Sequence, residues 1–109
     1  MYLIVTKTFP PEIGGMQNLM WGLTNELSKD YMIKVFADYH ENHKNFDEKV
    51  SFSIERVGGI KLLRKFRKAQ LINEFIKKSK IKGVIADHWK SLELIKTTKT
   101  LLLRAVPFS

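Results

Sequence analysis

Short apolar runs alternate with longer amphipathic stretches along this chain. The first run, residues 2–6, is apolar and rich in β-branched residues, which is typical of a strand buried on both faces. The next stretch, residues 16–27, repeats apolar residues at the spacing of one helical face: Met16, Leu19, Met20, Leu23 and Leu27. We therefore expect a buried strand followed by an amphipathic helix.

The same alternation continues along the rest of the sequence. We expect strands at residues 31–37, 50–57 and 82–86, a polar loop at 38–49, helices at 60–80 and 89–100, and the start of another strand near Val106. Strands that alternate with helices form βαβ units with right-handed crossovers and a parallel sheet. The predicted fold class is therefore α/β, a Rossmann-like parallel sheet with flanking helices.

Residues 9–17, Phe-Pro-Pro-Glu-Ile-Gly-Gly-Met-Gln, form the turn between the first strand and the first helix. Pro10 and Pro11 fix φ and lack N–H donors, so a central strand cannot continue through them. Gly14 and Gly15 have no Cβ, which permits positive φ and a close approach to the main chain. Because a helix N-terminus presents unpaired N–H groups and partial positive charge, the expected guest is an anion such as phosphate or carboxylate.

The alternative is a tight turn whose glycines only relieve packing between helix and sheet. The dinucleotide motif G-x-G-x-x-G is absent, and no Gly-Lys-Ser/Thr follows as it would in a P-loop. The sequence therefore predicts a sparser glycine loop than either of these motifs.

The 109 residues suffice for about one small domain and include no cysteine, which excludes disulfides and thiolate metal sites. We see no signal peptide, and no apolar run approaches the roughly 20 residues that span a bilayer. The net charge of +8 is divided unevenly: residues 1–55 carry five Lys/Arg and eight Asp/Glu, whereas residues 56–109 carry fourteen and three. We expect a cytoplasmic protein whose basic half meets an anionic partner.

A second polar segment follows the strand expected at residues 82–86. Because ligands bind at the carboxyl ends of strands in an open parallel sheet, we expect this segment and the glycine turn to form one site. Asp87 and His88 have hydrogen-bonding groups for a polyol, Trp89 has a flat face for a sugar, and Lys90 has a charge for a phosphate. The alternatives are that Asp87 caps the following helix and that Trp89 packs in the core.

Two further histidines, His40 and His43, lie near Glu41 in the predicted loop. No secondary structure fixes a third ligand there, so we expect exposed side chains and no metal site. No Ser/His/Asp or Cys/His arrangement typical of nucleophilic catalysis is legible, and His88 is the only histidine at a predicted strand end.

The helix expected at residues 60–80, with the residues after it, is strongly basic. Between residues 61 and 82 a single acid, Glu74, stands among nine cations: Lys61, Arg64, Lys65, Arg67, Lys68, Lys77, Lys78, Lys80 and Lys82. A solvated helix face is the first interpretation. Peripheral contact of residues 61–82 with an anionic membrane at its inner face is the second, because basic amphipathic helices with aromatic residues bind lipid headgroups. Nucleic acid is not expected, because no binding motif or stacking platform is present.

Taken together, these residues resemble the GT-B glycosyltransferases of the retaining, family-four type. The resemblance rests on Phe9-Pro10-Pro11 and Gly14-Gly15-Met16-Gln17 after the apolar strand. The run Val84-Ile85-Ala86-Asp87-His88-Trp89-Lys90-Ser91 is similar to the fourth-strand motif of the family. The resemblance covers nearly the whole chain.

The resemblance implies roles for both segments. Gly14 and Gly15 would face the diphosphate of a nucleotide-sugar donor, and residues 87–90 would line the acceptor side of the cleft. Many members carry two histidines one residue apart where this chain has Ala86-Asp87-His88, which departs from the family pattern. The resemblance therefore leaves the catalytic residue unknown, with His88 as a weak candidate. The implied activity is transfer of a hexose or related sugar to a glycan or lipid-linked acceptor in cell-envelope polysaccharide synthesis. The nucleotide-sugar is a substrate, and no cofactor or metal is implied.

The resemblance also implies that residues 1–109 are part of an N-terminal domain. The next strand of the family would begin near Val106, and a C-terminal domain that binds the nucleotide-sugar would follow, so we expect a fragment that is inactive alone. The alternative is a non-catalytic, flavodoxin-like α/β binding or regulatory module that recognises a small anion.

Overall fold

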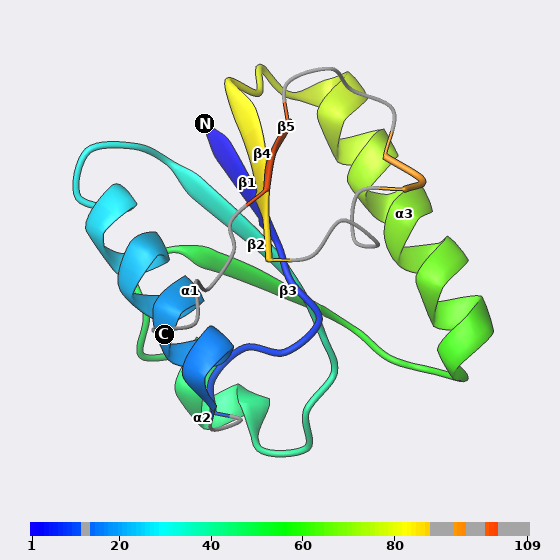
Figure 1. Ribbon diagram of the computed structural model, residues 1–109, viewed down its shortest axis with the longest axis horizontal. Coiled ribbons are helices and arrows are strands. Elements are labelled where there is room, and N and C mark those ends of the chain that lie inside the picture. Colours follow the sequence, from blue (N-terminus) through cyan, green and yellow to red (C-terminus); the bar gives the residue numbers. More distant parts are fainter. Residues whose placement is uncertain (12–13, 88–92, 96–99, 103–109) are drawn as a thin grey trace, which may run out of the picture.

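The computed structural model describes residues 1–11, 14–87, 93–95 and 100–102, which build a five-stranded parallel sheet with helices on both faces (Figure 1). Its elements are β1 (Tyr2–Val5), α1 (Gly15–Leu27), β2 (Ile33–Asp38), α2 (His43–Asp47), β3 (Ser53–Val57), α3 (Lys61–Lys78), β4 (Gly83–Ala86) and β5 (Thr100–Leu102). The predicted α/β class, with a Rossmann-like parallel sheet and flanking helices, is confirmed.

The strands lie in the order β3-β2-β1-β4-β5, and all their pairings are parallel. β1 is central, with Ile4 opposite Val35 of β2 and Ile85 of β4. A Rossmann sheet has this order, whereas a flavodoxin-like sheet has the order 2-1-3-4-5. The order reverses between β1 and β4, so the switch point of the topology lies at the carboxyl ends of these two strands.

Successive residues of β1 point into two separate cores. Ile4 belongs to the core beneath α1, together with Met20, whereas Leu3 and Val5 belong to the core beneath α3, together with Ile72. Each of these side chains is at most 1% exposed. α1 and α3 therefore cover opposite faces of the sheet, as Figure 1 shows.

Phe9, the first residue of the proline and glycine turn, is fully buried. Its ring makes edge contacts with Trp21, Phe46 and Phe52 at centroid distances of 6.1 to 6.3 Å. Edge contacts between aromatic rings contribute about 0.5–1.5 kcal/mol each beyond their buried area. The start of the turn is thus fixed by an aromatic cluster that joins α1, α2 and the approach to β3.

Several expected elements differ in their extent. The loop expected at residues 38–49 contains the short helix α2, and the strand expected at 50–57 is confined to Ser53–Val57. β2 begins at Ile33 and not at residue 31, because the N–H of Tyr31 still bonds to the carbonyl oxygen of Leu27 and closes α1.

We expected a helix at residues 89–100, and this prediction is wrong for the part of the segment that the structure describes. Residues 93–95 are not helical, and Thr100–Leu102 form β5 beside β4. The strand expected near Val106 lies outside the described residues. A short apolar run has too little periodicity to distinguish a strand from a helix. Residues 88–92, 96–99 and 103–109 lie outside the described part.

None of the helices in the described ranges has the length and hydrophobicity that a bilayer crossing requires.

Candidate functional site

Four polar side chains meet at the carboxyl edge of the sheet. They are Thr6 after β1, Asp38 at the end of β2, Asp87 after β4 and Lys68 from α3. This edge includes the switch point between β1 and β4, where open parallel sheets bind ligands. We name these four residues the edge cluster.

Thr6 and Asp87 connect the two strands that flank the switch point. Thr6 is fully buried, and its Oγ1 lies 2.7 Å from Oδ2 of Asp87 and 2.9 Å from the carbonyl oxygen of Thr8. The single hydroxyl hydrogen can be donated to only one of these oxygens at a time. Oδ1 of Asp87 is buried and has no hydrogen-bond partner within the described residues. It is therefore an acceptor that a hydroxyl or amide donor of a ligand would satisfy.

Lys68 is the buried cation of the edge cluster, with 9% of its surface exposed. Its Nζ donates to Oδ1 of Asp38 at 2.9 Å and to the main-chain oxygen of Thr6 at 2.5 Å. Arg64, one turn earlier on α3, lies 3.4 Å from Oδ2 of the same Asp38 carboxylate. α3 therefore binds the carboxyl ends of both β1 and β2 through charged groups.

Burial lowers the pKa of Lys68 below its usual value of 10.5, because the charged form loses hydration. The carboxylate of Asp38 opposes this change through its charge and its hydrogen bond, and the charge of Asp87 opposes it more weakly. The net direction is downward, so Lys68 releases its proton more readily than an exposed lysine does.

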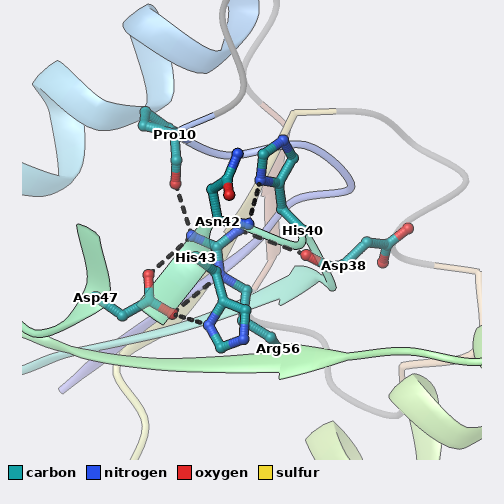
Figure 2. A network of polar contacts seen from close by, with 7 residues as sticks. All are labelled: Pro10, Asp38, His40, Asn42, His43, Asp47 and Arg56. Carbon is teal, nitrogen blue, oxygen red and sulfur yellow. Dashed lines mark hydrogen bonds and ion pairs between the residues drawn. The ribbon is translucent and has the colours of Figure 1, made fainter. Parts of the chain in front are cut away.

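A second polar network, centred on Arg56 of β3, holds the proline turn in place (Figure 2). The Arg56 side chain is only 4% exposed and binds Asp47 with two donors, Nε to Oδ2 at 3.2 Å and Nη2 to Oδ1 at 2.9 Å. Nη2 also donates to the carbonyl oxygen of Pro10 at 2.6 Å, and Nη1 to that of Asp38 at 3.4 Å. One guanidinium thus ties the turn after β1 to the ends of β2 and β3.

The glycine turn connects this carboxyl edge to α1. Gly14 is the N-cap of α1, without a side-chain cap, and the first turn of the helix contains no acidic residue. Neither Gly14 nor Gly15 uses the positive φ that glycine permits: Gly14 is extended, with φ 170°, and Gly59 is the one glycine with positive φ in the described segments.

The two glycines have different surroundings. A Cβ on Gly14 would collide with the side chain of Gln17, which lies back over the turn. Within the described residues, a Cβ on Gly15 would meet nothing within 4 Å beyond its two chain neighbours and the backbone of its own helix. The first N–H groups of an α-helix lack intrahelical acceptors, and those of α1 follow directly after Gly14.

Of the predicted site residues, Gly14, Gly15 and Asp87 belong to this edge of the sheet. The predicted partners His88, Trp89 and Lys90 lie outside the described residues. Sequence reasoning missed Thr6, Asp38 and Lys68. Thr6 and Asp38 carried a signal, because each is a polar residue at the end of an apolar strand; Lys68 was grouped with the solvated cations of its helix.

His40 and His43 are half-buried, not fully exposed as expected. Nδ1 of His40 accepts the N–H of Asn42 at 3.2 Å, and Nδ1 of His43 lies 3.1 Å from Oδ2 of Asp47 (Figure 2). Both histidines therefore support the loop around α2. The described residues contain no group of three or more His, Cys, Asp or Glu placed to hold a metal ion.

Comparison with known proteins adds no family assignment, because no protein-family model matches the chain and no curated protein matches it either. The functional argument therefore depends on the sequence motifs and on the geometry of the carboxyl edge.

Proposed function

We propose that this chain is the acceptor-side, Rossmann-like part of a GT-B glycosyltransferase, which transfers a sugar from a nucleotide-sugar donor to a glycan or lipid-linked acceptor. One observation carries the proposal: the uncapped start of α1 at Gly14 and Gly15 follows the central strand β1, next to the switch point. The polar groups of a ligand at this edge would meet main-chain N–H donors on one side and the edge cluster on the other.

The start of α1 would act on the diphosphate of the donor. The N-terminus of a 13-residue helix carries about half a positive charge and several unpaired N–H groups. These donors are fixed before the reaction, so they stabilise the charge that develops on a leaving diphosphate. The space at Gly15 supports this role, because no described side chain other than that of a chain neighbour lies within 4 Å of a Cβ placed there.

The end of β4 would contact the acceptor. Oδ1 of Asp87 is buried without a described partner, and a sugar hydroxyl is a donor of the kind that it lacks. Thr6 holds the other oxygen of this carboxylate, so the orientation of the free oxygen is fixed. His88 remains the catalytic candidate within the proposal, with Trp89 and Lys90 as further contacts on the acceptor side.

NMR titration of the ¹⁵N-labelled chain tests the donor role. UDP-glucose and GDP-mannose should shift the amide signals of Gly15 and of the first turn of α1. Gly15→Ala should weaken this binding by about tenfold or more, because the added methyl group blocks the approach to the helix start. Gly22→Ala is the matched control, since Gly22 lies in the same helix and also faces open space.

Two results would contradict the proposal. Equal affinity of wild type and Gly15→Ala would remove the helix start from the binding site. Amide shifts confined to other parts of the chain, with the first turn of α1 unmoved by either nucleotide-sugar, would do the same. Binding of the chain to lipid vesicles is measured without any nucleotide, so its outcome does not depend on the donor role of α1.

A further inference from the structure

The first two turns of α3 carry large apolar side chains on the surface of the protein. Leu62, Leu63 and Phe66 are 66%, 65% and 55% exposed, and Ile60, immediately before the helix, is 74% exposed. The buried face of the same helix is formed further along by Ile72, with Phe75 packed beside it. We name Ile60, Leu62, Leu63 and Phe66 the α3 patch.

Positive charge surrounds the α3 patch. Lys61 and Arg67 are exposed on the same two turns, and neither has an acidic partner among the described residues. Lys65 pairs with Glu93 at 2.7 Å, but its side chain is still 46% exposed. No acidic residue interrupts the helix sequence between residues 61 and 73. The surface thus combines protruding apolar groups with unneutralised cations.

The α3 patch lies at the carboxyl edge of the sheet. Arg64, on the same turns of α3, reaches the Asp38 carboxylate at the end of β2. Tyr39, which follows Asp38 in the chain, is 56% exposed. Its N–H bonds to the carbonyl oxygen of Val57, three residues before Ile60. A surface that covers the α3 patch would therefore also lie close to the edge cluster.

The geometry points to docking of the α3 patch on an anionic lipid bilayer. A helix surface with apolar side chains and flanking Lys and Arg is suited to the boundary between headgroups and acyl chains. Each cation near an anionic surface adds attraction, which salt screens. A fluid bilayer accommodates exposed side chains without a surface of matching shape, which a protein partner would need.

The proposed membrane contact is confined to residues 60–67, whereas the sequence alone predicted contact along residues 61–82. Lys77 and Lys78 lie ten or more residues beyond Arg67, which is about 15 Å along the helix axis and further than a Debye length at physiological salt. The docked orientation would hold the carboxyl edge close to the lipid surface, where a lipid-linked ligand would be presented. The docking itself does not depend on the proposed transferase activity.

Cosedimentation of the full 109-residue chain with vesicles tests the proposal. Vesicles of phosphatidylcholine with phosphatidylglycerol should bind the chain at low salt, whereas phosphatidylcholine alone should bind it weakly. Combined Leu62→Gln, Leu63→Gln and Phe66→Gln should lower partitioning by about tenfold or more, because burial of one such side chain is already equivalent to about a tenfold change. All three side chains are exposed, so the fold should persist, and circular dichroism checks this.

Two matched variants identify the surface. Met32→Gln removes another exposed apolar side chain, which is 72% exposed and lies just before β2, at the amino ends of the strands. This substitution should leave vesicle binding unchanged. Lys61→Glu with Arg67→Glu should reduce binding and its salt dependence more than Lys77→Glu with Lys78→Glu. The proposal is overturned if anionic vesicles do not bind the chain, if the triple variant binds like wild type, or if the Lys77 and Lys78 pair has the larger effect.

Discussion

Nζ of Lys68 and Oδ1 of Asp38 lie 2.9 Å apart, and this ion pair joins the middle of α3 to the last residue of β2. Both side chains are largely buried, at 11% and 14% exposed. The same Nζ donates to the main-chain oxygen of Thr6, so a single ammonium group connects the ends of two neighbouring strands. The integrity of the carboxyl edge should therefore depend on Lys68.

Lys68→Met tests this dependence, because methionine keeps the length of the side chain and removes its charge and its donors. Among the described residues, the carboxylate of Asp38 would retain only Arg64 at 3.4 Å, and the Thr6 oxygen would lose its side-chain donor. We expect the free energy of unfolding to fall by about 1–3 kcal/mol in urea titrations. Lys77→Met, at an exposed position of the same helix, should change it by less than about 0.5 kcal/mol. Equal effects of the two substitutions would contradict the structural role of Lys68.

The lowered pKa of Lys68 predicts a pH dependence of stability with a definite sign. Between the folded pKa and the unfolded value of 10.5, the unfolded chain binds more protons, so the free energy of unfolding rises with pH in this window. Below the folded pKa the full penalty for burying the ammonium group is present. The difference in unfolding free energy between wild type and Lys68→Met should therefore grow as pH rises toward 10.5. A ¹³C NMR titration of the lysine side chains should find Lys68 below the exposed lysines; a difference that stays flat with pH would contradict the lowered pKa.

The α/β class, the parallel sheet and the position of the glycine turn follow from local patterns in the sequence. Apolar runs, two prolines and two glycines determine where β1 ends and α1 begins. Because ligands bind at the carboxyl ends of strands in an open parallel sheet, Asp87 after β4 could be predicted as a site residue as well. These features were predictable because each depends on residues close together in the chain.

The rest of the edge depends on contacts between distant segments. Lys68 lies four residues before the buried Ile72 and therefore shares its face of α3. Because lysine is seldom buried, we expected its side chain to be exposed to solvent. Its acceptors, Thr6 and Asp38, lie 62 and 30 residues away. The exposure of Leu62, Leu63 and Phe66 was also not predictable from the sequence, because helical periodicity alone does not show where the sheet beneath a helix ends.

Arg56→Lys should weaken the anchor of the proline turn. A lysine has one ammonium group and cannot reproduce the planar fork that binds Asp47 with two donors and Pro10 with a third contact. We expect a loss of about 2–4 kcal/mol in the free energy of unfolding, because the carboxylate and the carbonyl oxygen would be left partly unpaired in a buried site. A double-mutant cycle with Asp47→Asn should give a coupling of about 1 kcal/mol or more, and additive effects would rule out the direct contact.

Gly22→Ala should stabilise the protein. Gly22 lies in the middle of α1, and among the described residues a Cβ there would meet nothing within 4 Å beyond its chain neighbours and its own helix backbone. Alanine reduces the conformational freedom of the unfolded chain and favours the helix, so we expect a gain of about 0.5–1 kcal/mol in thermal or urea unfolding. A loss of stability would mean that the exposed face of α1 is packed against something at this position.

Thr6→Val should destabilise the protein, because it removes the one described hydrogen-bond donor to the Asp87 carboxylate. Valine has nearly the shape of threonine but no hydroxyl group, so both carboxylate oxygens of Asp87 would lack a donor among the described residues. Because an unsatisfied buried acceptor is destabilising, we expect the free energy of unfolding to fall by about 1–3 kcal/mol. In an Asp87→Ala background the same substitution should cost much less, since no carboxylate remains to be satisfied. Urea unfolding of the four proteins gives the coupling between the two positions, and a coupling near zero would mean that the contact of 2.7 Å does not hold the ends of β1 and β4 together.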